Sequence, residues 1–264
     1  MTAIALTIAG SDSGGGAGIE ADLKTFAALG VYGTAAITAL TAQNTKGVFA
    51  IHEVPADFIA AQVDAVFADF AVGAVKIGMV PTAAAIDSVV AALDRHRPRH
   101  IVLDPVMVAT SGDQLLHGDA LSRLRALIAR ASVITPNLPE AATLLDLPLA
   151  HDEAEMRVQA EKLKAFDTGA VLIKGGHGGG PESVDLLLDG GHWLRLAAPR
   201  IDTKNTHGTG CTFAAAIAAG LAKGLNLEAA AREAKAFVTA AIAAADRLAV
   251  GYGHGPLHHF HAWW

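Results

Sequence analysis

The chain has 264 residues, a net charge of -6 at neutral pH, and 52% hydrophobic residues against 17% charged ones. This length suffices for one large α/β domain with a substantial core, and the hydrophobic content excludes a disordered protein. The weakly acidic balance gives no support for nucleic-acid binding. A single cysteine excludes an intrachain disulfide and fits a reducing compartment, so we expect a cytoplasmic protein.

The apolar N-terminal segment predicts a buried first strand over Ile4–Ala9. It lacks the basic start of a signal peptide, and the polar Ser11 follows almost at once. Other apolar runs are rich in alanine and are broken by residues such as Lys223 and Lys235, so none qualifies as a membrane span. We therefore expect no membrane segment.

Strand and helix patterns alternate along the chain. Apolar runs and residue alternation predict strands at Ile4–Ala9, Tyr32–Leu40, Val48–Val54, Ala74–Ile77, Ile101–Leu103, Val133–Ile134, Ala170–Ile173, Val184–Leu188 and His192–Leu196. Helical periodicity predicts helices at Ile19–Leu29, from Pro55 onward, and at Thr82–Asp94, Asp119–Ala129, Pro139–Leu145, Glu153–Ala165, Thr212–Lys223 and Leu227–Leu248. Such alternation predicts a mostly parallel sheet covered on both faces. No repeat or linker divides the chain, so one domain over residues 1–264 is expected.

Polar side chains follow the predicted strands at the point where each strand ends. They are Asp12, Gln43, Asn44, Asp104, Asn137, Glu140 and Lys174. Ligands of open α/β sheets bind at the carboxyl ends of the strands. The sequence therefore predicts an active site at this rim of the sheet.

The stretch Thr203–Thr212 places Gly208 and Gly210 on either side of Thr209, directly before an alanine-rich segment. Glycines there let the backbone bend sharply and approach a ligand closely. The N–H groups that begin the following helix attract anions, most often phosphate. Cys211 would lie at this positive helix end, which lowers the pKa of a thiol and favours a thiolate base. The alternative is a plain helix-capping turn with Cys211 as a small core residue.

Asn137 and Glu140 lie three residues apart at a predicted helix start, so both are on one face. Together with Asp104 they could hold Mg²⁺ through water, as hard oxygen ligands do beside nucleotide phosphates. The alternative is a capping box, in which the two residues serve only the helix. Their place at the sheet rim favours the metal site.

Lys174 ends a predicted strand and is followed by the flexible pair Gly175 and Gly176. A cation at the sheet rim could contact a nucleotide phosphate. An ordinary tight turn explains the same residues equally well, so both interpretations stay open.

Two common nucleotide-binding motifs do not apply. Residues 16–21 fit the loose pattern G-x-G-x-x-A after a strand, but a dinucleotide site also needs an acid about 20 residues later. The chain has no acidic residue between Asp22 and Glu53. It also has no G-x-x-x-x-G-K-[ST] motif, so it is not a P-loop enzyme.

Histidines and aromatic residues are interleaved near the end of the chain, at His254, His258, His259, Phe260, His261, Trp263 and Trp264. The histidine spacing matches no zinc template. An ordered, packed tail is the favoured interpretation.

Several motifs together identify a family. In chain order they are residues 10–19 and 21–25, Ala42–Thr45, Lys76–Met79, Asp104–Met107, Thr135–Ala141, Lys174–His177, Lys204–Thr212 and Gly255–Trp264. This set resembles the hydroxymethylpyrimidine/phosphomethylpyrimidine kinases of thiamine biosynthesis over essentially the whole chain, and the match is highly specific. One departure is Thr110, where many relatives are expected to carry a lysine.

The resemblance implies a ribokinase-like three-layer α/β/α fold with a mostly parallel central sheet, and it implies ATP and Mg²⁺. It also implies two successive phosphorylations, of 4-amino-5-hydroxymethyl-2-methylpyrimidine to its monophosphate and of the monophosphate to the diphosphate. We expect a homodimer.

The resemblance also implies roles for individual residues. Substrate binding is expected from Gly10, Asp22, Gln43, Met79 and Val106. Cys211 stands where most ribokinase relatives carry an aspartate base, and the catalytic turn is completed by Gly208, Thr209 and Gly210. Nucleotide contacts are expected from Lys174, Thr206 and His207, beside the metal candidates Asp104, Asn137 and Glu140.

Two other functions remain as alternatives. A pyridoxal kinase of the same superfamily also acts on a hydroxymethyl heteroaromatic. Gln43 favours the aminopyrimidine, because its amide can both donate and accept against the ring nitrogen and amino group. A catalytically inactive pyrimidine or nucleotide sensor would be favoured if Cys211 or the glycine turn were missing, and both are present.

Overall fold

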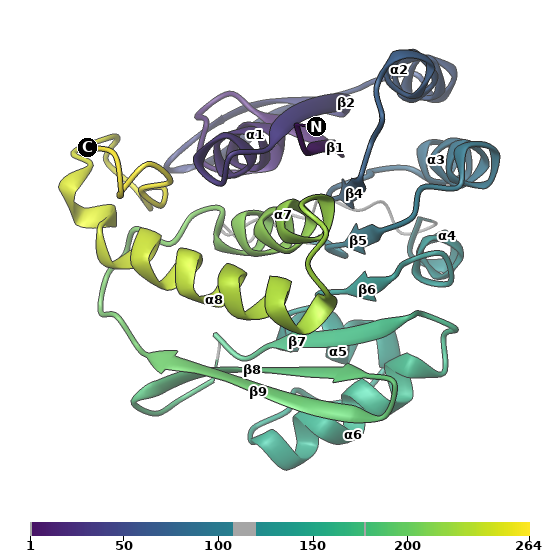
Figure 1. The fold of residues 1–264 in the computed structure, drawn as a ribbon. Coiled ribbons are helices and arrows are strands. Elements are labelled where there is room, and N and C mark those ends of the chain that lie inside the picture. The colour runs from purple at the N-terminus through teal and green to yellow at the C-terminus, as the bar shows by residue number, and fades with distance from the viewer. Residues whose placement is uncertain (1, 108–119, 177) are drawn as a thin grey trace.

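The computed structural model describes residues 2–107, 120–176 and 178–264, so Thr110 and His177 lie outside the described residues. One sheet crosses the molecule between two layers of helices (Figure 1). The described strands form it in the order β3-β2-β1-β4-β5-β6-β7-β8-β9. Their bounds are β1 Ile4–Asp12, β2 Tyr32–Asn44, β3 Gly47–Glu53, β4 Ala74–Ile77, β5 Ile101–Leu103, β6 Val133–Ile134, β7 Ala170–Lys174, β8 Glu182–Asp189 and β9 His192–Pro199.

The middle of the sheet is parallel and its two ends are antiparallel. β1 pairs in parallel with β2 and β4, and parallel pairing continues through β5, β6 and β7. β3 at one end, and β8 and β9 at the other, run antiparallel to their neighbours. The carboxyl ends of β1, β2, β4, β5, β6 and β7 therefore meet at one rim, which confirms the mostly parallel sheet.

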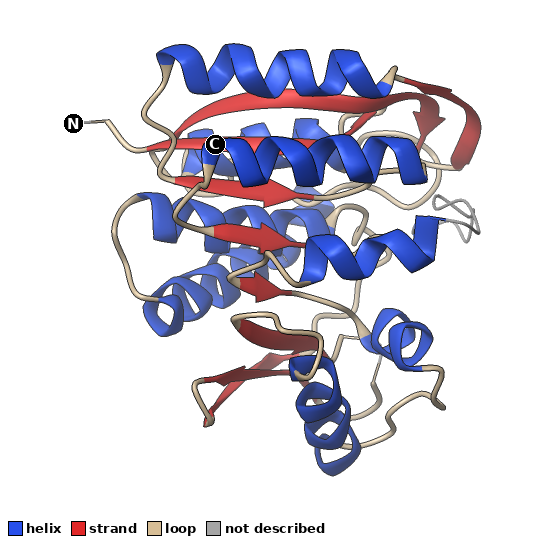
Figure 2. Ribbon diagram, turned by 90° about the vertical axis from the view of Figure 1, so that its right-hand side faces the viewer, coloured by secondary structure: helices blue, strands red, loops and turns tan. Residues whose placement is uncertain are grey.

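Helices cover both faces of the sheet (Figure 2). One face carries α1 Gly18–Ala28, α7 Thr209–Ala222 and α8 Leu227–Ala243. The opposite face carries α2 Ala56–Asp69, α3 Ala83–His96, α4 Ala120–Ile128, α5 Leu138–Leu145 and α6 Glu153–Lys164. This is the predicted three-layer α/β/α arrangement. Among the described helices, none combines the length and apolar character needed to span a bilayer.

Two hydrophobic cores flank the sheet because strand side chains alternate between its faces. In β1, Leu6 and Ile8 pack into the core beneath α2 to α6, and Ala5 faces the core of α1, α7 and α8. All of these side chains are fully buried. Both faces are thus apolar, as a doubly covered parallel sheet requires.

Small residues let α7 lie close to its neighbours. α7 contacts β1, β4 and β5 as well as α1 and α8. A Cβ at Gly220 would lie only 2.8 Å from the Cβ of Ala230 in α8, so the two helices touch at this glycine. The close packing fixes the N-terminus of α7 at the rim where the parallel strands end.

Several elements are longer or shorter than the sequence predicts. β1 continues to Asp12 and β2 to Asn44, because residues 11 and 12 pair with β2 and the end of β2 forms a hairpin with β3. The stretch around Gln43 is therefore strand and tight turn, not an open loop. α8 ends at Ala243 and is followed by a 3₁₀ turn over Ala245–Arg247, where Thr203 and Asn205 donate hydrogen bonds to Asp246.

The C-terminal tail is ordered and partly buried. His258 and His259 are buried, and His259 Nε2 lies 2.9 Å from the hydroxyl of Thr212 in α7. Burial lowers the pKa of His259 to about 4, so this histidine is neutral at physiological pH. Trp263 and Trp264 are 71% and 70% exposed, so the packed-tail prediction holds for these histidines but not for the terminal tryptophans.

Candidate active site

The loop after β1 folds around the carboxylate of Asp12. Its Oδ1 accepts a hydrogen bond from the Gly14 amide at 2.8 Å, and its Oδ2 accepts from the amides of Gly16 and Ala17 at 3.0 and 2.9 Å. Burial acts to raise the pKa of Asp12, but the hydrogen bonds from His207 and Gly14 outweigh it and hold the pKa below its usual value. Asp12 is therefore an ionised residue that shapes the glycine loop.

The turn before α7 packs directly against this loop. Gly208 has φ of 83°, the left-handed region, and a Cβ there would overlap the carbonyl oxygen of Gly16. Only glycine fits both requirements. α7 then begins at Thr209, whose hydroxyl donates to the Thr206 carbonyl at 2.7 Å. The first turn of the helix faces the rim of the sheet, so its positive end points toward the place where the sequence predicts an anion.

Cys211 lies in this first turn and is half-buried. The predicted thiolate is wrong for the protein without ligands, because burial raises the pKa of the Cys211 thiol to about 11. Lys76 opposes this effect, whereas the carboxylates of Asp22 and Asp104 add to it. Desolvation of the charged form thus outweighs the helix end and the nearby lysine. At neutral pH the residue is a thiol.

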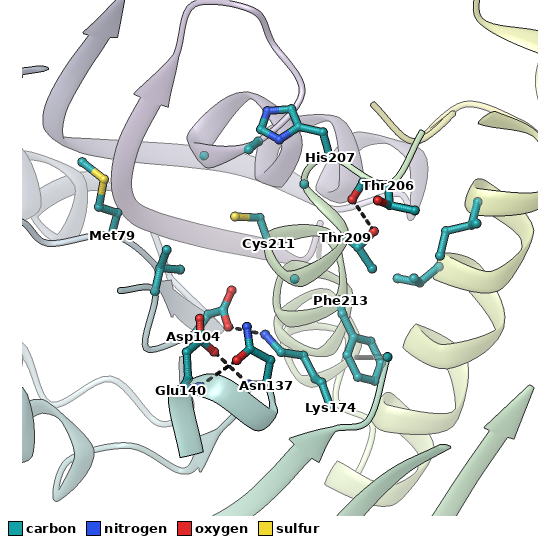
Figure 3. Close-up of a pocket in the computed structure, with 18 of the residues that line it drawn as sticks. Met79, Asp104, Asn137, Glu140, Lys174, Thr206, His207, Thr209, Cys211 and Phe213 are labelled. Carbon is teal, nitrogen blue, oxygen red and sulfur yellow. Dashed lines mark hydrogen bonds and ion pairs between the residues drawn. The ribbon is translucent and has the colours of Figure 1, made fainter. Parts of the chain in front are cut away.

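Lys174 and Asp104 form an ion pair beside the helix start (Figure 3). Lys174 Nζ lies 2.6 Å from Asp104 Oδ1, which also lies 3.2 Å from the Thr135 hydroxyl. A Cβ at Gly210 would lie 3.1 Å from Lys174 Nζ and 3.4 Å from Asp104 Oδ2, so the pair touches the turn. Three separate segments of the chain, which contribute Asp104, Lys174 and Gly210, therefore meet at this point of the predicted site.

Asn137 and Glu140 form a complete capping box at the start of α5. Asn137 Oδ1 accepts from the Glu140 amide, and Glu140 Oε2 accepts from the Asn137 amide, both at 2.8 Å. The capping interpretation is therefore correct as local structure. Burial, with a further contribution from Asp104, raises the pKa of Glu140 to about 7, although Lys174 opposes the shift. Among the described residues, no three or more His, Cys, Asp or Glu side chains are grouped so that they could bind a metal ion.

A cavity of about 670 Å³ joins these elements. Asn44 and Asp22 do not line it. Its lining does include the other residues that the sequence predicts for the site, namely Gly10, Asp12, Gln43, Met79, Asp104, Val106, Asn137, Glu140, Lys174, Thr206, His207, Gly208, Thr209, Gly210 and Cys211. The prediction that the sheet rim gathers these residues is confirmed.

Asp22 lies beneath the cavity floor instead of facing the cavity. Its Oδ2 accepts hydrogen bonds from the Thr7 hydroxyl at 2.6 Å and from Lys76 Nζ at 2.8 Å, and both charged side chains are fully buried. The expected direct contact of Asp22 with substrate therefore does not match its position. The sequence does not reveal a role for Lys76, whose positive charge acts to lower the pKa of Cys211.

One end of the cavity combines apolar and amide groups. Gly10 lies against Met79, since a Cβ at this glycine would come within 2.9 Å of Met79 Cε. Val106 packs against Met79 from the next strand end. His207, which was expected to contact nucleotide, is instead hydrogen-bonded to Asp12 at 2.9 Å and lies 3.4 Å from the amide of Gln43. His207 thus belongs to the Gln43 end of the site.

The other end of the cavity contains residues that the sequence analysis missed. Phe213 of α7 with Val238 and Ile242 of α8 form an apolar wall. Nearby, Lys235 Nζ pairs with Asp185 Oδ2 at 2.8 Å, and Asp185 Oδ1 accepts from the amide that follows Lys174 at 2.9 Å. In the sequence, Lys235 is recognisable only as a lysine that interrupts an apolar, alanine-rich run.

A model of the phosphomethylpyrimidine kinase family matches residues 12–258. The chain belongs to this family. A hydroxymethylpyrimidine/phosphomethylpyrimidine kinase from Rhizobium meliloti is 59% identical over 265 residues, which cover 100% of this chain and 99% of the relative.

Solved structures related to this phosphomethylpyrimidine kinase family member have the same fold. An ADP complex of Bacillus subtilis pyridoxal kinase superposes with a TM-score of 0.91 at 38% identity, covering 98% of each chain. A phosphomethylpyrimidine kinase from Clostridium difficile 630 gives a TM-score of 0.80 at 42% identity, covering 90% of this chain and 99% of the other. The predicted ribokinase-like fold is confirmed by these kinase structures.

Proposed function

We propose that this chain transfers the γ-phosphoryl group of ATP to 4-amino-5-hydroxymethyl-2-methylpyrimidine and then to the resulting monophosphate. The observation that carries the proposal is that one cavity joins three parts. The Gln43 amide lies at one end and the apolar wall that includes Phe213 at the other. Between them lie Lys174 and the turn at Gly208, which is called the anion turn below. The Rhizobium meliloti relative bears the name of both activities. Phosphoryl transfer needs such positioning and charge neutralisation more than covalent help.

In the first reaction, the hydroxymethyl oxygen forms a bond to the γ-phosphorus and the bond to the β–γ bridging oxygen breaks, so ADP leaves. The N–H groups that begin α7, together with Lys174, neutralise charge on the transferred group. Cys211 lies at the same turn, and the small fraction of it that is ionised to the thiolate accepts the hydroxyl proton. In the second reaction, a phosphate oxygen of the monophosphate attacks in the same way, and no hydroxyl proton has to be removed.

The pyrimidine end of the cavity carries Gln43, Met79, Val106 and Gly10. We assign the ring to this end, because the Gln43 amide offers a donor and an acceptor while Met79 and Val106 offer apolar contact. The opposite wall of Phe213 and its neighbours is the place for the adenine of ATP. The Bacillus subtilis relative, which binds ADP, supports a nucleotide at this site.

Gln43→Ala is expected to weaken pyrimidine binding and leave ATP binding nearly unchanged. Loss of one partner of a buried hydrogen bond costs about 1–3 kcal/mol, which corresponds to roughly 5- to 150-fold in affinity. Isothermal titration with each ligand measures both effects. Unchanged affinity for the pyrimidine would remove Gln43 from the substrate site.

We propose that Asp104 and Glu140 would hold Mg²⁺ when nucleotide is bound, with Asn137 close by. The residues fit a hard divalent cation: they offer oxygen donors, and Asp104 contributes to the raised pKa of Glu140, so the two carboxylates repel each other. When bound, the ion would neutralise phosphate charge. Asn137 Oδ1 is already used as a helix cap, so its share would be through water.

Glu140→Gln is expected to raise the Mg²⁺ concentration needed for half-maximal rate severalfold, because a charged oxygen ligand is lost. Glutamine keeps an acceptor for the Asn137 amide, so the melting temperature should stay within a few degrees. Glu155→Gln is the matched control, since Glu155 holds the same position in the first turn of α6, accepts a hydrogen bond from the nearby His151 amide and does not line the cavity. A fall in melting temperature with an unchanged Mg²⁺ requirement would leave Glu140 with a capping role only.

A second candidate activity is phosphorylation of pyridoxal. The observation that favours it is the close match to the Bacillus subtilis pyridoxal kinase structure. An assay that couples ADP release to a colour change, run with the aminopyrimidine, its monophosphate and pyridoxal in turn, separates the two kinases. No ADP release with any of them would support the sensor alternative and overturn the proposal.

We also propose that the protein is a cytoplasmic homodimer. The edge strand β3 and helix α2 expose large apolar side chains, with Phe49 68% and Phe58 60% accessible, and Ile51 of β3 and Leu40 of β2 are exposed as well. A second copy would cover this edge of the sheet, since an exposed apolar edge strand is a ready surface for association. Sedimentation should give twice the monomer mass. The free Cys211 fits a reducing cytoplasm.

A further inference from the structure

The side-chain amide of Gln43 lies between two polar groups that come from different parts of the chain. Its nitrogen is 3.4 Å from His207 Nε2, in the turn before α7. Its oxygen is 3.1 Å from Thr41 Oγ1, two residues earlier in β2. An amide has nearly the same shape when it is turned by 180°, so hydrogen bonding alone decides which end faces which neighbour.

The hydrogen bonds of His207 favour the orientation in which the amide oxygen of Gln43 faces this histidine. Asp12 Oδ2 lies 2.9 Å from His207 Nε2, and an ionised carboxylate can only accept a hydrogen bond. Nε2 must therefore carry a hydrogen. An amide NH₂ group 3.4 Å away would place donors against each other, whereas the amide oxygen would face the positive end of the ring N–H.

The hydrogen bonds of Thr41 favour the orientation in which the amide nitrogen of Gln43 faces this threonine. The Thr41 hydroxyl has one hydrogen, and it donates that hydrogen to the carbonyl oxygen of Ser11 at 2.8 Å. An amide oxygen at 3.1 Å would then face a lone pair of the hydroxyl. An amide NH₂ group in that place would donate to the same lone pair. Both neighbours therefore favour one orientation, with the Gln43 oxygen toward His207 and the nitrogen toward Thr41.

We propose that Asp12, His207 and Thr41 select the substrate by fixing the polarity of the Gln43 amide. The amide oxygen turns one lone pair toward the His207 N–H, which Asp12 also accepts, and one amide N–H donates to Thr41. One lone pair and one N–H of the amide then remain for the ligand. The remaining pair recognises a ring that presents a donor on the His207 side and an acceptor on the Thr41 side. This inference rests on the proposed function, in which Gln43 binds the pyrimidine.

The substrate proposed above has this pattern on one edge. Its 4-amino group is the donor, and the adjacent ring nitrogen is the acceptor. The amino group would lie on the His207 side, and the hydroxymethyl group, which is attached to the neighbouring ring carbon, points beyond it toward the turn at Gly208. The same amide orientation therefore also directs the reacting oxygen to the anion turn.

Pyridoxal presents the opposite pattern at this position. Its ring carries an aldehyde oxygen, an acceptor, next to the hydroxymethyl group. That oxygen would face the Gln43 oxygen and leave two acceptors without a hydrogen between them. The 4-oxo analogue of the pyrimidine is a sharper probe, because exchanging the amino group for an oxo group reverses both polarities with almost no change in shape.

The test compares the wild type with Thr41→Val, Thr41→Ser and Gln43→Ala. For each, the inhibition constant of the 4-oxo analogue is divided by the KM of the aminopyrimidine. We expect a ratio well above one for the wild type and for Thr41→Ser, which keeps the hydroxyl. Thr41→Val should lower the ratio by roughly 5- to 30-fold, the effect of losing one hydrogen bond that fixes the amide, and Gln43→Ala should bring it near one.

Thr41→Val also removes the donor to Ser11, so the melting temperature and kcat of each variant are measured together with the ratio. A ratio for Thr41→Val equal to the wild-type value would overturn the proposal. A crystal structure with the aminopyrimidine bound provides a second test that needs no variant. The amino group is expected on the His207 side, and the reverse orientation would contradict the inference. Failure of the wild type to phosphorylate the pyrimidine at all would instead overturn the proposed function.

Discussion

The Cys211→Ala variant is expected to phosphorylate the pyrimidine alcohol roughly 10²-fold more slowly than the wild type and the monophosphate at close to the wild-type rate. The alcohol must lose a proton as it attacks, whereas the monophosphate has a second pKa of about 6 and is already mostly dianionic at neutral pH. General-base catalysis contributes about 10²–10⁴-fold, and the lower end applies because burial raises the pKa of the thiol to about 11. Alanine keeps the backbone amides of the turn in place.

The same assignment predicts different pH dependences for the two steps. The base is the thiolate, so its fraction rises about tenfold with each pH unit below the pKa of about 11. The first phosphorylation should therefore accelerate from pH 7 to pH 9, and the second should stay nearly flat above about pH 6. In Cys211→Ala the slope of the first step should disappear. Equal loss in both steps would mean that Cys211 supports the turn and is not the base.

Gly208→Ala is expected to abolish most activity in both phosphorylations and to destabilise the protein. A non-glycine residue in the left-handed region costs about 1–2 kcal/mol, and the added methyl group overlaps the Gly16 carbonyl oxygen. The turn must move away from the glycine loop, and a displacement of about 1 Å at a reacting centre can cost roughly 10²-fold in rate. Rates of both steps and the melting temperature are the measurements.

Gly224→Ala is the matched control for this variant. Gly224 also has a positive φ, of 89°, but a Cβ there would meet no atom within 4 Å. It lies outside the cavity lining. The control should lose a similar conformational energy and keep its activity. If Gly208→Ala resembled this control in both measurements, the close contact with Gly16 would have no catalytic importance.

Much of the fold and of the site could be predicted from the sequence. The strands are short apolar runs, and a parallel arrangement brings their carboxyl ends to one rim, so Asp104 and Lys174 could be expected to meet. The structure places them 2.6 Å apart. Gly208 could be recognised as a turn residue because the helix-forming alanines begin just after it. These features depend on local pattern and on the direction of strands, which sequence reasoning captures.

The electrostatics could not be predicted in the same way. The pKa of Cys211 depends on how deeply the first turn of α7 is buried and on Lys76 and Asp22, which approach it from β4 and α1. Asp22 faces inward because its helix packs on β1, where Lys76 neutralises it. Likewise, Lys235 reaches the site only because α8 packs against β9, which brings the lysine to Asp185 of the neighbouring strand β8. Each of these facts depends on tertiary packing between distant segments.

The contact between the glycine loop and the turn before α7 has a consequence for how the protein becomes active. Asp12 and His207 are 195 residues apart in the chain, yet they share one hydrogen bond. During synthesis the first four-fifths of the polypeptide therefore contains the glycine loop after β1 without the turn at Gly208 that packs against it. Contacts of such long sequence separation form late, because the loop between them must close first. Ligand that bridges the two segments binds only the finished fold, so substrate should stabilise the whole molecule in a single unfolding transition.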